Sequence, residues 1–169
     1  IRSLTRWDNQ DIMDYLSFEY EGNQIIGVSD NGYPPYSYDS KQYYDYANTD
    51  VEFAYDANGN MIYDLDRNIC AIKYNLLNLP DTIQFANGNL IVHQYDALGN
   101  VRETYMGLTN TTFQCVQQMQ YYPSGLPWND NYQPSQQPFK YGGKEFVEMH
   151  GLDEYDSEAR WYYPALMRT

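Results

Sequence analysis

The residue types that most often do chemistry in proteins are sparse in this chain of 169 residues, and their spacing matches no common site. The two histidines, His93 and His150, are 57 positions apart, and neither lies in a pattern typical of zinc ligands. Asp153 and Asp156 form an acid pair of the kind that glycosidases use, but such pairs are common in a chain with 23 acidic residues. The chain has no Gly-x-Ser-x-Gly, no phosphate-binding glycine-rich loop and no His-Glu-x-x-His. We therefore predict no catalytic residue, no metal site and no cofactor.

The two cysteines carry no clearer signal. Cys70 and Cys115 are 45 positions apart and would pair only if the fold brought them together. Cys115 falls inside an alternating run of apolar and polar residues, which predicts a buried thiol. A Cys–His nucleophile built from Cys115 with His93 or His150 stays open from the sequence.

The charge of the chain disfavours one class of partner. With 23 acidic and 10 basic residues the net charge is −13, and the basic residues are scattered singly. Such a surface repels phosphate backbones, so we expect no nucleic-acid partner. No apolar run approaches the roughly 18 residues that a membrane-spanning helix needs. The acidity comes without an Asp-x-Asp-x-Asp-Gly calcium loop and indicates solubility.

An internal repeat indicates the secondary-structure elements that position these residues. The hexapeptide Tyr-Asp-Ala-x-Gly-Asn occurs at 55–60 and again at 95–100, which is 40 positions later. A degenerate copy starts at Tyr74, and a shortened one, Tyr-Glu-Gly-Asn, starts at Tyr20. An internal period of about 20 residues indicates a repeat architecture.

Each repeat has the residues of a strand, a turn and a second strand. The tyrosine ends an incoming strand, and the following Asp accepts a hydrogen bond from the backbone two residues later. Asn and Gly then tolerate the positive φ of a tight hairpin. Twenty tyrosines and few strong helix formers also favour strands, so we predict an all-β fold of consecutive antiparallel β-hairpins. The predicted turn residues are Asp56, Asn58, Gly59, Asp96, Gly99 and Asn100.

The chain divides into three segments. Residues 1–50 hold a hairpin over 16–28 and a tyrosine-rich connector, and residues 51–122 hold the regular repeats. The clearest strand is 112–122, with Phe113, Cys115 and Gln117 on one face. Residues 123–169 are rich in turn signals, and only 144–149 could form a short helical turn. We expect the last segment to be irregular.

Exposed aromatic side chains offer a binding surface as an alternative role. The stretch from Tyr33 to Asp50 reads as a connector, but its rings could also stack on sugars or peptides. The residues of this candidate binding surface are Tyr36, Tyr38, Tyr43, Tyr44, Tyr46 and Trp128.

The order of these motifs resembles the YD-repeat family, and the C-terminal part resembles the RHS repeat-associated core region. The resemblance rests on the repeats, on Asp-Ala-Leu-Gly-Asn-Val-Arg at 96–102 and on Lys-Tyr-Gly-Gly-Lys-Glu at 140–145. It continues through Met-His-Gly-Leu at 149–152 to Tyr-Asp-Ser-Glu-Ala-Arg-Trp-Tyr-Tyr-Pro at 155–164, and residues 1–50 match loosely. The core-motif residues are Lys144, Glu145, Asp156, Arg160 and Trp161.

The resemblance implies a spiralling strip of hairpins that closes, in complete family members, into a shell around a C-terminal toxin. It also implies a bacterial protein that is secreted or displayed at the cell surface. Many members cut their own chain in an aspartyl-protease-like reaction at Asp-Pro-x-x-Gly-Arg. This chain has Tyr163 in place of the Asp and Met167 in place of the Gly. Because tyrosine cannot act as a carboxylate and Met167 crowds a turn, we predict no self-cleavage.

Three functions follow as hypotheses. The first is a non-enzymatic structural module whose partner is the remainder of an RHS protein or a toxin. The second is a module that binds carbohydrate or a cell-surface protein, and the third is a residual aspartyl autoprotease. An incomplete strip leaves strand edges unpaired, which favours self-association. Because the chain starts at Ile1 without an apolar signal segment, we expect its natural N-terminus to be missing.

Overall fold

The computed structural model describes residues 1–8, 11–32, 43, 45–47, 49–108, 112–129 and 131–169. The fold is all-β: the described part of the chain forms thirteen strands, two short 3₁₀ turns and no α-helix. The strands pair antiparallel with their sequence neighbours, as the predicted consecutive hairpins require. Accordingly, the described residues contain no helix that could cross a membrane. The chain forms two compact units, Ile1–Ile72 and Lys73–Thr169.

The first unit begins with a three-stranded sheet in the order β1 (Ser3–Asp8), β2 (Asp11–Glu21) and β3 (Gln24–Asp30). It continues with β4 (Phe53–Tyr55), β5 (Met61–Asp64) and the start of β6 (Ile69–Tyr74). Leu16, Val28 and Phe53 form its buried apolar core, and five half-buried apolar side chains surround them. The antiparallel pairing of β2 with β3 confirms the hairpin that was predicted over 16–28.

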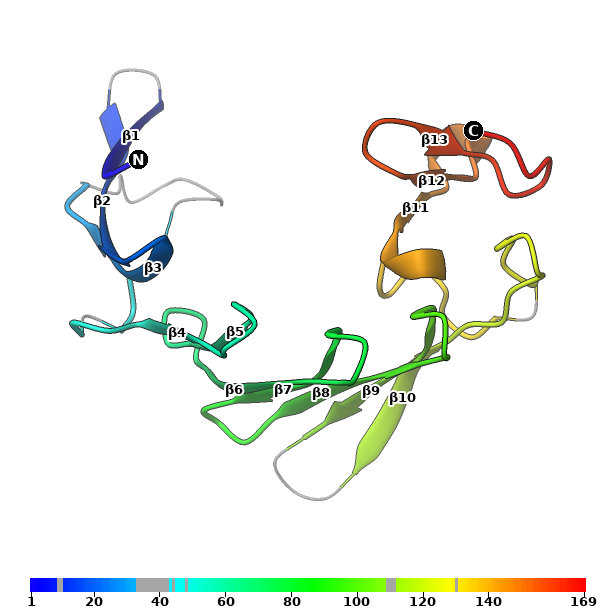
Figure 1. Ribbon diagram of the computed structural model, residues 1–169, viewed down its shortest axis with the longest axis horizontal. Helices are drawn as coiled ribbons and strands as arrows, with labels where there is room; N and C mark the ends of the chain where they lie inside the picture. The colour runs from blue at the N-terminus through cyan, green and yellow to red at the C-terminus, as the bar shows by residue number, and fades with distance from the viewer. Residues whose placement is uncertain (9–10, 33–42, 44, 48, 109–111, 130) are drawn as a thin grey trace. The chain divides into compact units, whose positions relative to one another are not determined.

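The second unit contains four antiparallel neighbours that run side by side in Figure 1. They are β7 (Pro80–Phe85), β8 (Leu90–Tyr95), β9 (Val101–Gly107) and β10 (Phe113–Gln118). Its C-terminal part holds the 3₁₀ turns η1 (Tyr141–Gly143) and η2 (Met149–Gly151) and a small sheet of β11 (Glu145–Val147), β12 (Glu154–Asp156) and β13 (Trp161–Tyr162).

Three local predictions were wrong. The strand expected over 112–122 ends at Gln118, and a bulge between Cys115 and Gln117 breaks its alternation. The bulge leaves Phe113 61% exposed while Gln117 is fully buried, so the two do not share one apolar face. Cys115 is only partly buried, and both cysteines carry reduced thiols. The helical turn expected over 144–149 is instead β11, because Glu145, Phe146 and Val147 pair with β12.

Candidate functional site

The turn at 56–60 uses almost every polar group of its motif to hold its own backbone. The Asp56 carboxylate accepts hydrogen bonds from the backbone nitrogens of Asn58 at 2.8 Å and Asn60 at 2.9 Å. Its second oxygen accepts one from the Asn60 side-chain amide at 2.9 Å. The backbone closes with Asp56 N to Asn60 O at 2.8 Å and Gly59 N to Asp56 O at 3.0 Å. These bonds, led by that from the Asn60 side chain, lower the pKa of Asp56.

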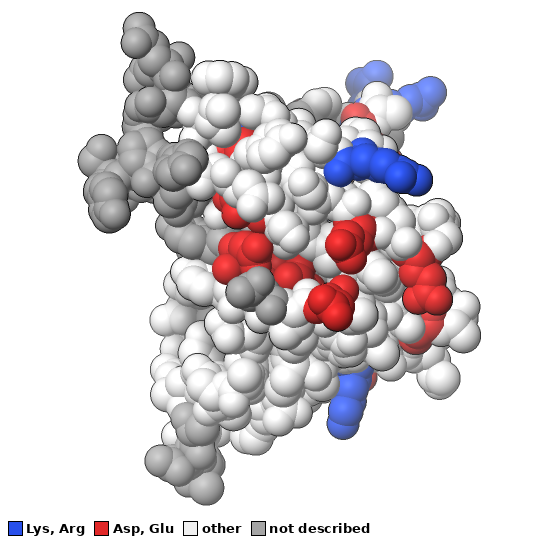
Figure 2. Space-filling model, turned by 90° about the vertical axis from the view of Figure 1, so that its left-hand side faces the viewer, with Lys and Arg blue, Asp and Glu red and all other residues white. Residues whose placement is uncertain are grey.

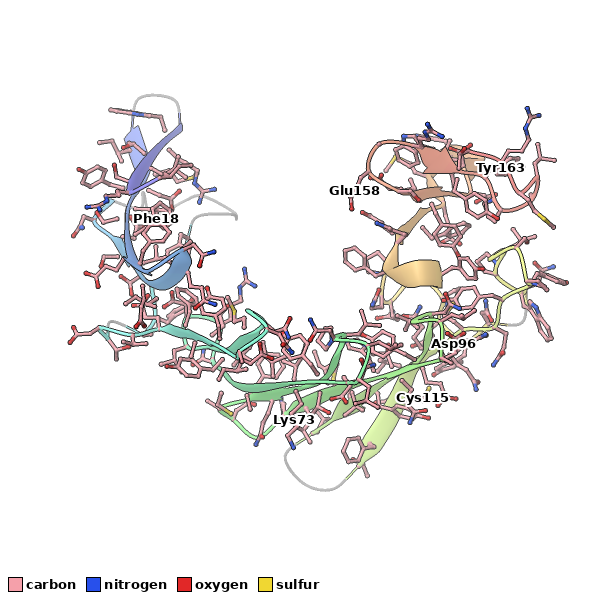
Figure 3. The ribbon with its side chains drawn as sticks, in the orientation of Figure 1. Phe18, Lys73, Asp96, Cys115, Glu158 and Tyr163 are labelled. Atoms are coloured by element: carbon pink, nitrogen blue, oxygen red, sulfur yellow. The ribbon has the colours of Figure 1, made fainter. Side chains whose placement is uncertain are left out.

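The turn at 96–100 repeats this geometry 40 residues later (Figure 3). The Asp96 carboxylate accepts from the backbone of Leu98 at 2.9 Å and Asn100 at 3.0 Å, and from the Asn100 amide at 2.8 Å. Gly59 and Gly99 occupy the same turn position with φ of 84° and 82°. Each turn spans five residues, and its glycine has the positive φ that the sequence predicted.

The same backbone turn recurs where the sequence motif is weak or missing. Asn75 replaces the Asp at 75–79, with Asn78 at φ 62° in place of the glycine. Turns at 85–89 and 122–126 also join the first nitrogen to the fifth carbonyl, with Gly88 and Gly125 at positive φ. Sequence analysis identified the turn-rich segment at 123–128 but missed the turn at 85–89. Its signal is the Asn-Gly at 87–88 between two apolar runs.

The second Tyr-Asp turn is tied to neighbouring elements. Arg102 donates from Nε to the Asp96 carboxylate at 2.9 Å, and its guanidinium lies 5.1 Å from the centre of the Tyr121 ring. Asn100 is 3% exposed, and its Oδ1 accepts a hydrogen bond from Gly142 N at 2.6 Å. Burial alone would raise the pKa of Asp96, but the bonds from Asn100, Leu98 and Arg102 outweigh it and lower that pKa. Hydrogen bonds of this turn thus connect the hairpins to η1.

The hydroxyls of many tyrosines bind backbone carbonyls. In the Tyr-Asp repeats, the hydroxyl of Tyr55 donates to Ile25 O and that of Tyr95 donates to Pro80 O, both at 2.9 Å. At the turn 122–126, three consecutive carbonyls each accept from a different tyrosine. Pro123, Ser124 and Gly125 accept from Tyr141 at 3.2 Å, Tyr162 at 2.8 Å and Tyr155 at 2.8 Å, respectively.

These contacts explain the tyrosine content of the chain in structural terms. A tyrosine ring supplies apolar area to a thin sheet, and its hydroxyl satisfies a carbonyl that a phenylalanine would leave unpaired. Tyr155 is 1% exposed, and its burial, together with the neighbouring Tyr121, raises its pKa. The Tyr155 hydroxyl is therefore a neutral donor at physiological pH.

The predicted core-motif residues lie around the small C-terminal sheet. Glu145 pairs with Asp156 across β11 and β12, and Asp156 pairs with Trp161 across β12 and β13. Lys144 forms an exposed ion pair with Glu158 at 3.2 Å. Arg160 forms no ion pair with any residue that the structure describes.

The region that corresponds to the cleavage motif forms a turn without an acid pair. Tyr163 N donates to Arg168 O at 2.7 Å, and Met167 between them has φ 53° (Tyr163 is labelled in Figure 3). The adjacent open cavity, about 590 Å³, has Glu154 as its only carboxylate side chain among the described lining residues.

The predicted binding tyrosines fall in different places. Tyr36, Tyr38 and Tyr44 lie outside the described residues. Tyr43 and Tyr46 line a cavity of about 440 Å³ in the first unit, together with Phe53, Asp64, Asp66, Arg67 and Asn68. Trp128 belongs to the second unit, where it is 48% exposed and its ring centre lies 5.7 Å from that of Tyr122.

The first unit also brings together three carboxylates that sequence reasoning missed. Oxygens of Asp45, Glu52 and Asp66 lie within 4.8 Å of one another. Burial, followed by the repulsion of Asp66 and Asp45, raises the pKa of Glu52. An all-oxygen set of this kind could hold a hard cation such as Ca²⁺. Figure 2 shows the acidic character of this side of the molecule.

The spacing of these three acids explains why sequence analysis overlooked them. They are separated by 7 and 14 positions and match no calcium-loop motif. Only the fold brings Asp45 and Glu52 close to Asp66 in the turn after β5. Each is also held by the protein itself. Asp66 accepts from Tyr46 N at 3.2 Å and from the Tyr43 hydroxyl, Glu52 accepts from Val28 N at 2.7 Å, and Asp45 accepts from Asp30 N at 3.2 Å.

Comparison with known proteins adds no assignment: no protein-family model matches the chain, and no curated protein sequence matches it.

Proposed function

We propose that this protein is a non-enzymatic structural module of the RHS/YD-repeat type. Its hairpins form part of a spiralling strip that scaffolds or encloses a toxin polypeptide or a surface partner. The support is the use of the motif residues: Asp96, Gly99 and Asn100 hold backbone geometry.

One observation supports this proposal more strongly than the other observations do. The Asn100 side chain joins its own turn to Gly142, 42 residues later, while the turn's Asp96 binds Arg102. A turn that is locked both locally and to a distant segment suits a rigid wall, because it fixes where the next hairpin starts. The proposed setting is a bacterial protein that is secreted or displayed at the cell surface.

The autoprotease hypothesis fits the geometry poorly. Tyr163 stands where the family has an aspartate, and Glu154 is the sole carboxylate of the described cavity lining. We expect the intact mass of the natural protein to stay unchanged on long incubation. A shortened product that ends near Tyr163 would restore the protease hypothesis.

Protease protection tests the scaffold function. The natural full-length protein is digested with a nonspecific protease, and fragments are identified by mass spectrometry. An enclosed polypeptide should survive in the wild type and in the exposed-site control Lys73→Ala, and should be degraded in Asp96→Ala, because that change opens the wall. If the enclosed polypeptide were degraded as fast as every other segment in all three proteins, the proposal would be contradicted.

A second candidate function rests on the cavity of Tyr43 and Tyr46. Aromatic rings beside carboxylate, guanidinium and amide groups are suited to sugars, which offer apolar faces and many hydroxyls. A glycan-binding screen should then show saturable binding that Tyr46→Ala removes and Trp128→Ala keeps. Equal binding by both variants would count against this site.

A further inference from the structure

The cavity of Tyr43 and Tyr46 in the first unit has an aromatic part to its lining. The rings of Tyr43, Tyr46 and Phe53 line it, and the side chain of Met61 belongs to the same lining. Tyr46 is 64% exposed and Tyr43 is half-buried, so both side chains have surface that a ligand can reach. The volume of about 440 Å³ lies within the range of pockets that hold small organic ligands.

The charge around this cavity is negative. Asp64 and Asp66 are among the lining residues. Oxygens of Asp45 and Glu52 lie within 4.8 Å of an oxygen of Asp66. Arg67 is the sole basic side chain of the described lining; it is 79% exposed and its Nε lies 3.5 Å from Asp64. Four carboxylates therefore surround the site, and the one guanidinium is mostly in water.

Two neighbouring groups respond to this negative field. Burial, followed by the hydrogen bond and the charge of Asp66, raises the pKa of the Tyr43 hydroxyl. Burial also raises the pKa of Glu52, and the charges of Asp66 and Asp45 add to that rise. Both shifts mean that a further negative charge is disfavoured here. The field therefore repels an anionic ligand and attracts a cationic one.

The carboxylates of the lining are already bonded to the protein. Asp66 Oδ1 accepts from the backbone nitrogens of Tyr46 at 3.2 Å and Ala47 at 3.1 Å. Its Oδ2 accepts from the Tyr43 hydroxyl. Asp64 accepts from the backbone nitrogen three residues later at 3.1 Å. Asp64 is 4% exposed and Asp66 is 5% exposed, so these acids act on a ligand through their field rather than as hydrogen-bond acceptors.

Reachable rings and a negative field together select one class of cation. A quaternary ammonium group has no N–H donor that needs an acceptor, and it is attracted both to the faces of aromatic rings and to negative charge at a distance. A metal ion such as Ca²⁺ instead needs oxygen ligands in direct contact. A primary ammonium would leave its donors without acceptors in this lining, which costs free energy.

We propose that this cavity binds a quaternary ammonium group, such as the trimethylammonium head of choline. The methyl groups pack on the rings of Tyr43 and Tyr46, and the buried carboxylates attract the charge without a direct hydrogen bond. The proposal does not depend on the scaffold role of the Tyr-Asp turns. It concerns the same cavity as the sugar hypothesis, but here the ligand is selected by its charge.

The test compares two probes of the same shape on the full chain. Choline carries the positive charge, whereas 3,3-dimethylbutan-1-ol has the same skeleton and hydroxyl with a neutral carbon in place of the nitrogen. Calorimetric titrations contain EDTA, so that no metal ion screens the carboxylates. We expect saturable choline binding and an affinity at least about tenfold lower for the alcohol. Added salt should weaken choline binding, because it screens the field.

Variants of one ring locate the site. Tyr46→Leu keeps an apolar side chain but removes the ring, so it should weaken choline about fivefold or more. Tyr46→Phe keeps the ring and should bind choline about as tightly as the wild type. Trp128→Leu removes an exposed ring from the second unit and should leave choline binding intact.

A second pair of variants tests the charge. Asp45 is not among the described lining residues, so Asp45→Asn removes negative charge without changing the cavity wall. It should weaken choline about threefold and leave the affinity for the neutral alcohol unchanged. Asp153→Asn removes an exposed carboxylate from the second unit and should leave both affinities unchanged.

Several results would overturn the proposal. They are the absence of saturable choline binding, equal affinities for choline and the neutral alcohol, and unchanged choline binding in Tyr46→Leu. Saturable sugar binding by a protein that does not bind choline would overturn it in favour of the sugar. Amide spectra confirm that each variant is folded. If Asp45→Asn fails to fold, the comparison of the two probes on the wild type still decides.

Discussion

Asn100 Oδ1 lies 2.6 Å from the backbone nitrogen of Gly142, and this bond connects a Tyr-Asp turn to a segment 42 residues away. The same side chain donates from Nδ2 to Asp96 at 2.8 Å. One short amide therefore closes its own turn and fixes the start of η1.

Replacing this amide should cost more stability than the same change in the earlier turn. Asn100→Ala removes a bond to a carboxylate and a bond to Gly142 from a site that is 3% exposed, so we expect a loss of about 2 kcal/mol in the free energy of unfolding. Asn60→Ala removes the equivalent bond to Asp56 at a half-buried position and should cost about 1 kcal/mol. Urea unfolding of both variants measures the difference. Equal losses would mean that the contact with Gly142 contributes nothing.

Three glycines in equivalent turn positions provide a graded series. Gly59, Gly99 and Gly125 have nearly equal φ of 84°, 82° and 86°, so replacement by alanine adds a similar backbone strain of about 1–2 kcal/mol to each. The contacts of the new Cβ differ. Its nearest neighbour would lie at 3.9 Å at Gly59, at 3.2 Å on Leu79 at Gly99, and at 2.6 Å on the Tyr141 ring at Gly125.

The loss of stability should follow that order. Gly59→Ala should lose little stability beyond that caused by the backbone strain, and Gly99→Ala should lose somewhat more. Gly125→Ala should lose about 3 kcal/mol or more, because the ring of Tyr141 must move. Thermal unfolding ranks the three variants. A Gly125→Ala variant as stable as Gly59→Ala would show that the turn at 122–126 is not built as described.

Introducing a glycine at position 167 should stabilise the protein. Met167 is 70% exposed and has φ 53°, so Met167→Gly removes backbone strain at little cost in packing, and we expect a gain of about 1 kcal/mol. The neighbouring Leu166 is 61% exposed and does not have a positive φ, which makes Leu166→Gly the control; it should be neutral or destabilising. A loss of stability in Met167→Gly, measured by urea unfolding, would contradict the strained turn.

The sequence predicted the fold class and the turns well because both depend on local chemistry. The alternation in 16–28 and the Asp and Gly of each Tyr-Asp unit act within a few residues, and the structure contains the expected hairpins. The wrong predictions have non-local or irregular causes. A bulge after Cys115 inverted the faces of β10, and pairing with β12 turned 145–147 into a strand.

The sites were harder to foresee because their members meet only after folding. Asp45, Glu52 and Asp66 match no motif, and they come from different segments of the chain. Long-range packing of irregular segments has no periodic signature.

The buried hydroxyl of Tyr155 predicts a pH effect. Its raised pKa means that its contribution to stability is complete below the usual tyrosine pKa of about 10 and is lost as the pH rises further. Tyr155→Phe leaves Gly125 O unpaired and should lose about 1–1.5 kcal/mol at neutral pH. The variant should then show a shallower loss of stability than the wild type at alkaline pH.

Urea unfolding at neutral and alkaline pH measures this effect, with Tyr132→Phe as the control because Tyr132 is 46% exposed. The control should match the wild type at both pH values. If Tyr155→Phe were as stable as the wild type at neutral pH, the hydroxyl would not be bound to Gly125.

The claim that the Tyr-Asp units are hydrogen-bonded chain reversals can be tested by amide hydrogen exchange at Gly99 and Asn100. Both nitrogens donate within the turn, at 3.0 Å to Asp96 O and 3.0 Å to the Asp96 carboxylate, and both residues are buried. We predict slow exchange in the wild type, and faster exchange at Asn100 in Asp96→Ala. Fast exchange of both amides in the wild type would show that the turn does not exist.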